Sequence, residues 1–131
     1  VGLCWSSNRQ DKSMHSYKSI GIDRLIEDFR THLDGKSVVS LQVDEREDHQ
    51  RLGLTPATKN WMETLRSIRS CFKVLSVDTA VAHLAAGANI STQLILGKVF
   101  DWRWCRPEEG SWYPNLQRAG SSPHKSDNMK C

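Results

Sequence analysis

The chain has 131 residues, of which 38% are hydrophobic and 25% charged, and this is enough apolar material for one domain with a buried core. Its net charge is +3, and acidic and basic residues are interleaved, so charge gives no case for a nucleic-acid or anionic-membrane partner. The sequence has no apolar run near the length that spans a bilayer. These features indicate a soluble globular protein.

Four cysteines, Cys4, Cys71, Cys105 and Cys131, lie far apart in the sequence and form no CxxC pair. This spacing argues against a zinc site and against a disulfide framework, which a chain of this size does not need. We therefore expect reduced thiols in a cytoplasmic protein. The chain opens at Val1 without a signal-peptide pattern and looks like a strand already under way, so we expect a piece of a longer protein.

The first half of the chain is expected to form two strands with a helix between them. The strands are expected over residues 1–5 and 37–43, and the helix carries apolar residues at helical spacing, namely Ile22, Leu25, Ile26, Phe29 and Leu33. Asp34-Gly35 gives this helix a stop signal. Residues 44–53 are the most charged segment and are expected to be a loop, with a solvated face formed by Asp44, Glu45, Glu47 and Asp48.

The second half continues the alternation of strands and helices. Thr55-Pro56 can open a helix whose apolar stripe is formed by Trp61, Leu65 and Ile68. Strands are expected over residues 72–77 and 92–96, on either side of a helix from about residue 79 to 88. From about residue 98 the pattern dissolves, and segment 102–113 holds three of the five tryptophans.

Strands and helices that alternate in this way predict a parallel sheet covered by helices, because right-handed crossovers place each helix against the sheet. The predicted fold class is therefore α/β, with one Rossmann-like three-layer domain over residues 1–119. Residues 120–131 are polar and are expected to form a disordered tail.

Polar side chains follow three of the expected strands. Ser6 and Ser7 come after the first strand, Gln42 lies near the end of the second, and Asp78-Thr79 ends the third. The carboxyl ends of parallel strands lie at one edge of the sheet, where ligands bind in such folds. We therefore expect Ser6, Gln42 and Asp78 to converge there.

The segment SVDTAVAHLAA, residues 76–86, brings the start of a helix to the same edge. Unpaired N–H groups at a helix amino end suit a phosphate or diphosphate, and Thr79 and Ala80 would present them. His83 lies one turn further and could add a donor. Asp78 suits a hydroxyl group or the helix cap rather than a phosphate.

Simpler interpretations of these residues stay open. Asp78 or Thr79 can be a plain N-cap, His83 a satisfied core histidine, and Ser6-Ser7 an ordinary polar loop. The sequence contains no Gly-rich dinucleotide fingerprint, no P-loop and no GxSxG elbow. Taken alone, the residues therefore predict an α/β domain whose strand ends favour an anion.

Several motifs resemble the carboxyl-terminal half of bacterial glycosyltransferases with the GT-B fold. SVDTAVAHLAA is followed by DWRW and then by WYP, and this set is most similar to the heptosyltransferase-like family 9 domain found behind tetratricopeptide repeats. The opening VGLCWSSN resembles that family's VGLxWSGN. YKSI matches a basic-Ser-Ile element, and SLQ at 40–42 matches its second strand. The matches run from Val1 to about Leu116.

The resemblance implies the half of the enzyme that holds a nucleoside-diphosphate sugar. The sugar would pass to a hydroxyl of a glycan, lipid or protein acceptor, usually with inversion. The resemblance places residues of the first loop against the diphosphate, namely Ser6, Ser7 and Lys18. It also implies a diphosphate cradle at the third strand made of Asp78, Thr79, Ala80 and His83. Gln42 stands where the family has a residue near the nucleoside.

The same resemblance implies that the catalytic base comes from a missing amino-terminal half and that no metal or other cofactor is required. A second hypothesis is a non-catalytic protein-interaction module derived from this family, beside helical repeats, with segment 102–113 as its contact surface. The tryptophans can also simply pack against the sheet. We expect Trp102 or Trp104 to be largely buried beside the donor pocket.

Overall fold

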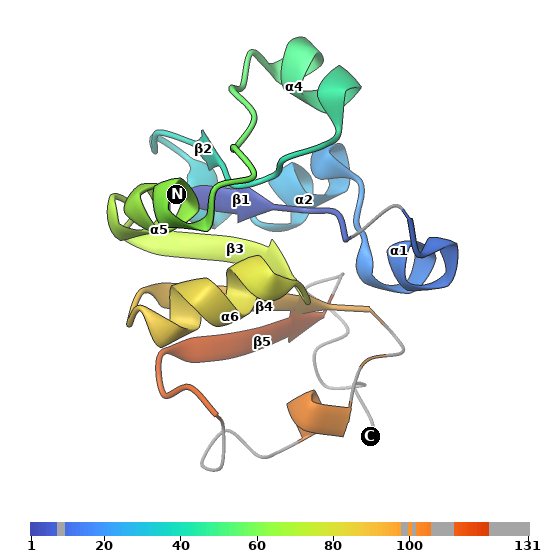
Figure 1. Ribbon diagram of the computed structural model, residues 1–131, viewed down its shortest axis with the longest axis vertical. Helices are drawn as coiled ribbons and strands as arrows, with labels where there is room; N and C mark the ends of the chain where they lie inside the picture. Colours follow the sequence, from blue (N-terminus) through green and yellow to red (C-terminus); the bar gives the residue numbers. More distant parts are fainter. Residues whose placement is uncertain (8–9, 98–99, 101, 106–111, 121–131) are drawn as a thin grey trace.

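The computed structural model describes residues 1–7, 10–97, 100, 102–105 and 112–120. Within these residues, five strands form a sheet in the order β2-β1-β3-β4-β5 (Figure 1). The strands are β1 (Gly2–Cys4), β2 (Val39–Ser40), β3 (Lys73–Val77), β4 (Ser91–Leu96) and β5 (Leu116–Gly120). Every pairing between them is parallel, which confirms the predicted Rossmann-like α/β fold.

Helices cover both faces of this sheet. α5 (Trp61–Arg69) and α6 (Ala80–Gly87) lie on one face, and α2 (Ile22–Asp28), followed by the single turn α3 (Arg30–Leu33), lies on the other (Figure 1). α1 (Lys12–Lys18) lies beyond the carboxyl ends of the strands, and α4 (Arg46–Leu52) lies outside the β2 edge. A short 3₁₀ helix, η1 (Trp102–Cys105), follows β4.

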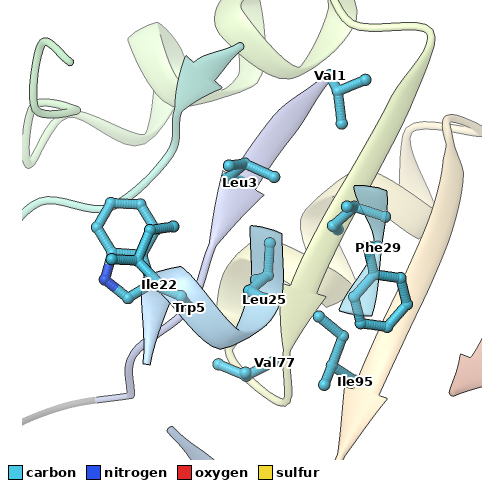
Figure 2. Close-up of a cluster of buried hydrophobic side chains, with 9 residues drawn as sticks. Val1, Leu3, Trp5, Ile22, Leu25, Phe29, Val77 and Ile95 are labelled. Carbon is cyan, nitrogen blue, oxygen red and sulfur yellow. The ribbon is translucent and has the colours of Figure 1, made fainter. Parts of the chain in front are cut away.

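The alternating side chains of the strands build a separate core on each face. Toward α2, the strands and the helix pack together residues that include Leu3, Trp5, Ile22, Leu25, Phe29, Val77 and Ile95 (Figure 2). Toward α5 and α6, the buried cluster is Cys4, Leu41, Ile68, Cys71, Val74, Val81 and Ala85. A third cluster joins α6, β4 and β5 to η1 through Ala82, Ala86, Leu94, Leu96, Trp104 and Leu116. The alanines of α6 let this helix lie close to the sheet.

The four expected strands are present at their predicted positions, although β2 is shorter than the predicted 37–43. β5 was not expected, because its sequence lies in a segment without strand periodicity. Its pairing with β4 runs from Thr92–Leu116 to Leu96–Gly120. Asn115 Nδ2 donates to the carbonyl oxygens of Ala86 (3.1 Å) and Ile90 (2.6 Å), which fixes the chain just before β5.

The expected solvated loop over residues 44–53 is wrong, since Arg46–Leu52 form α4. His49 of this helix is only 2% exposed. Its Nδ1 donates to the Glu45 carbonyl oxygen at 2.8 Å, and its Nε2 lies 2.7 Å from Ser40 Oγ. These two hydrogen bonds and a contact with the Trp5 ring hold the helix against the sheet edge.

Two other helices differ from the expectation. The single helix expected from Ile22 to Leu33 is interrupted at Phe29, whose φ of −114° and ψ of 24° separate α2 from α3. α5 begins at Trp61 instead of Thr55-Pro56, because Asn60 Oδ1 caps it by accepting hydrogen bonds from the amides of the first turn. Trp61 does not join the apolar stripe of α5 and is 57% exposed.

The disordered tail was predicted over residues 120–131. Gly120 is the last residue of β5, and residues 121–131 lie outside the described residues, so the tail and the domain limit at residue 119 stay predictions. In the part of the chain that the structure describes, no helix combines the length and apolarity that crossing a membrane requires.

A substitution at Gly2 tests how tightly β1 packs against Leu41 and Cys71 on the α5 side of the sheet. A Cβ at Gly2 would lie 2.7 Å from Leu41 Cδ1 and 3.2 Å from Cys71 Sγ, and both of these side chains are buried. We expect Gly2→Ala to lower the free energy of unfolding by about 1–3 kcal/mol through overpacking. Gly87→Ala is the control, because a Cβ there meets nothing within 4 Å and should raise it by up to about 1 kcal/mol. Urea denaturation of both variants measures this, and equal stabilities would contradict the packing.

Candidate functional site

The strand order places a crevice between β1 and β3. β2 lies on one side of β1, whereas β3, β4 and β5 follow one another on the other side. The strand order therefore reverses between β1 and β3. In open parallel sheets, ligands bind beyond the carboxyl ends of the strands at the point where the order reverses. Ser6 and Ser7 follow β1 at this point, and Asp78 and Thr79 follow β3.

A cavity of about 750 Å³ opens at this point of the sheet. Five of the predicted site residues line it, namely Ser6, Ser7, Gln42, Thr79 and Ala80. Trp61 and Val43, which are 57% and 40% exposed, add an apolar wall, and Asp44, Thr58 and Lys59 add polar groups. We call this cavity the groove.

A smaller cavity of about 300 Å³ lies beside the groove. Its lining consists of Lys18, Asp78, Thr79, Ala80, His83, Arg103 and Trp104. Thr79 and Ala80 border both cavities, so the groove and the small cavity meet at the start of α6. Each of the eight predicted site residues therefore lines one cavity or the other. Their role in binding a diphosphate stays a prediction.

Among the described residues, no side chain caps the amino end of α6. Thr79 occupies the N-cap position with an extended backbone, but its side chain makes no capping hydrogen bond. Its Oγ1 instead lies 3.3 Å from Ser76 Oγ and 3.7 Å from Cys4 Sγ. Asp78 is paired elsewhere, so the plain N-cap interpretation is not what the structure shows.

Asp78 forms an ion pair with Lys18 across the small cavity. Lys18 Nζ lies 3.0 Å from Asp78 Oδ2, and the two side chains are only 22% and 11% exposed. Lys18 is the last residue of α1, and Asp78 directly follows β3. The pair therefore joins α1 to the end of the central strand.

His83 is held by two aromatic residues. Its Nδ1 lies 2.9 Å from the Tyr113 hydroxyl, and its ring lies 5.1 Å from the Trp104 ring at an interplanar angle of 33°. Trp104 is 4% exposed, which confirms that one of the two tryptophans is buried, whereas Trp102 is 69% exposed. A hydrogen bond from Arg118 to the Trp104 carbonyl oxygen ties η1 to β5. His83 is thus positioned at the cavity wall by one residue of η1 and one residue just before β5.

Gln42 is buried and joins the end of β2 to the loop after β1. Its Oε1 accepts hydrogen bonds from the amides of Trp5 (3.1 Å) and Ser6 (3.0 Å) and from Cys4 Sγ (3.4 Å). Its Nε2 donates to the Ser6 carbonyl oxygen at 3.2 Å and to the Asp44 carboxylate. These bonds give Gln42 a structural role, and its predicted proximity to a nucleoside stays a prediction.

Glu45 and His15 contact Ser6 and Ser7 of the groove, and these contacts were not predicted from the sequence. Ser6 Oγ donates to Glu45 Oε1 at 2.7 Å, and His15 Nδ1 lies 3.1 Å from both the Ser7 carbonyl oxygen and Ser19 Oγ. Glu45 has a left-handed backbone, with φ of 65° and ψ of 51°, which non-glycine residues rarely adopt. The sequence feature that could have identified Glu45 is its position just past the second strand, at the same edge of the sheet as Ser6.

Burial raises the pKa of the Cys4 thiol to about 11, although hydrogen bonds with Thr79 and Ser76 act in the opposite direction. Cys4 lines the groove and is 3% exposed. A thiol that stays protonated at neutral pH is a poor nucleophile and a poor metal ligand. Cys4 and Cys71 are both free thiols. Burial at the groove wall therefore disfavours the thiolate form of Cys4.

Among the described residues, no three His, Cys, Asp or Glu side chains gather into a group that could hold a metal ion. That the function requires no metal stays a prediction. No protein-family model, no curated protein and no solved structure matches this chain. The resemblance to family 9 glycosyltransferases therefore rests on the quoted motifs and stays a prediction.

Trp104→Ala should lower the free energy of unfolding by about 3–5 kcal/mol, because it empties a buried position between α6 and β5. Trp102→Ala is the matched control in the same turn and should change stability by less than about 0.5 kcal/mol, since Trp102 is exposed. Thermal and chemical denaturation measure both variants. Equal losses would contradict the packing of η1 described above.

We expect the raised pKa of Cys4 to make the free energy of unfolding depend on pH at alkaline pH. Between pH 9 and pH 11 the unfolded chain loses the Cys4 proton while the folded protein keeps it, because its folded pKa is raised from 9.0 to about 11. The free energy of unfolding therefore falls as the pH rises through this range, by about 2–3 kcal/mol from this group. Cys4→Ser removes the titration and should give a shallower decline in urea denaturation. Parallel curves for the two proteins would contradict the shift.

Proposed function

We propose that this domain is the nucleotide-sugar-binding half of a GT-B glycosyltransferase of the heptosyltransferase-like family 9 type. It would hold the donor while the sugar passes, with inversion, to an acceptor hydroxyl. The catalytic base would come from an amino-terminal half of a longer cytoplasmic protein. The observation that carries the proposal is the meeting of two cavities at the uncapped start of α6, beside the crevice between β1 and β3.

The chemistry of the two cavities suggests how a donor would lie. The groove is the larger and has the exposed face of Trp61, which suits a nucleobase because aromatic faces stack on bases. The small cavity is lined by Lys18, Asp78, His83 and Arg103, which suit the hydroxyl groups of a sugar and the adjoining phosphate. The diphosphate would then cross from one cavity to the other at Thr79 and Ala80.

The proposed chemical role of this half is to stabilise the leaving diphosphate. Negative charge grows on the diphosphate as the bond to the sugar breaks, and fixed donors aimed at that charge lower the barrier. The N–H groups at the start of α6, the ammonium group of Lys18 and the ring of His83 are such donors. They can offset the charge without a metal ion.

Ala80 offers a direct test by calorimetry with ADP, GDP and UDP. Ala80 is exposed and borders both cavities, so a longer side chain there fills the site without disturbing a core. Ala80→Glu should abolish detectable binding by charge repulsion and keep or raise stability, because an acidic side chain suits the first turn of a helix. Ala80→Gln has the same length without the charge and should lose less affinity. Lys18→Ala should weaken binding about tenfold to a hundredfold.

Unchanged binding by folded Ala80→Glu would overturn this placement of the diphosphate. Absence of binding of all three nucleotides to the folded wild-type protein would overturn the donor-binding function. In that case the second candidate, a non-catalytic protein-interaction module, would gain support. The 69% exposure of Trp102 is the observation that favours this candidate, since exposed tryptophans are common anchors in protein interfaces.

A further inference from the structure

Among the described side chains, those that attach α1 to the rest of the protein make polar contacts. None of its described side chains is buried, and none of them belongs to the three hydrophobic clusters. His15 contacts the Ser7 carbonyl oxygen, and just after the helix Ser19 Oγ accepts from the Ser7 amide at 3.0 Å. Both contacts lead to the loop after β1. A helix held in this way depends on each polar contact more than a helix anchored in a core does.

An ion pair of Lys18 with Asp78 joins α1 to the end of the central strand. α1 lies beyond the carboxyl ends of the strands, next to the end of β3 (Figure 1). Lys18 lines the small cavity on one side and, on the other, a cavity of about 330 Å³ whose lining includes Tyr17, Arg24 and Ile95. Lys18 therefore forms part of the wall between these cavities, and Asp78 holds that wall in place.

We propose that the Lys18–Asp78 pair is a latch, which holds α1 over the sheet edge in the empty protein and which a diphosphate opens by taking Lys18 from Asp78. The second half of this proposal rests on the proposed function. Asp78 and a phosphate compete for one ammonium group, and the phosphate carries more charge and more acceptor oxygens. Once the diphosphate holds Lys18, α1 is tethered to the ligand instead of to the strand.

The latch can be tested without a ligand by amide hydrogen exchange. Asp78→Asn and Lys18→Met should each speed exchange in residues 12–18 by roughly three- to tenfold, with no change in α5. The double variant should exchange no faster than either single variant, because both remove the same contact. Lys12→Met is the matched control, since it removes an exposed cation from the same helix. If neither Asp78→Asn nor Lys18→Met changes the exchange rate in α1, the latch is overturned.

The transfer of Lys18 to a diphosphate is tested by adding inorganic pyrophosphate or ADP to the same variants. In Asp78→Asn the ligand should return exchange in α1 to the wild-type rate, because Lys18 then holds the ligand. In Lys18→Met the ligand should give no such protection. Equal protection in both variants would overturn the transfer. If neither compound binds the wild-type protein, the proposed function and the transfer both fail, whereas the ligand-free result still decides the latch.

Discussion

The buried amide of Gln42 is the constraint on which the candidate site depends. Its oxygen accepts from two consecutive amides, those of Trp5 and Ser6, which leave the sheet where β1 ends. Buried amides without a partner cost about 1–3 kcal/mol each, and Gln42, just past β2, removes this cost where the loop turns away from the sheet. The same contact sets the positions of Ser6 and Ser7. These residues in turn hold His15 and Ser19, which flank the end of α1 and thereby place Lys18 near Asp78.

Much of the fold follows from local patterns in the sequence. β1, β3 and β4 are apolar runs bounded by polar residues, and their alternation with helices requires a parallel sheet once crossovers are right-handed. α4 and β5 were missed because their stability comes from distant partners. The charged sequence of α4 is held by His49, whose partner Ser40 lies in β2, and β5 has little strand propensity of its own but completes a ladder along β4.

The candidate site was predictable to the extent that it follows from the topology. Residues at the ends of parallel strands must share an edge, so Ser6, Gln42 and Asp78 could be brought together from the sequence alone. What each side chain does there could not be predicted. Glu45 looked like one more charged residue, because its contact with Ser6 spans 39 positions and needs a left-handed backbone. Likewise, Asp78 could have been a cap until its pairing with Lys18 was seen.

The surroundings of Asp78 explain why an acidic residue can stand between the end of β3 and the start of α6. The carboxylate lies close to the partial positive charge at the amino end of α6 and 3.0 Å from Lys18 Nζ, so it faces two positive groups. It is the anion that the site itself supplies. An incoming diphosphate would need the same two positive groups and would meet a carboxylate already there. Affinity for such a ligand would therefore depend on how readily Lys18 leaves Asp78, and less on how many donors line the cavities.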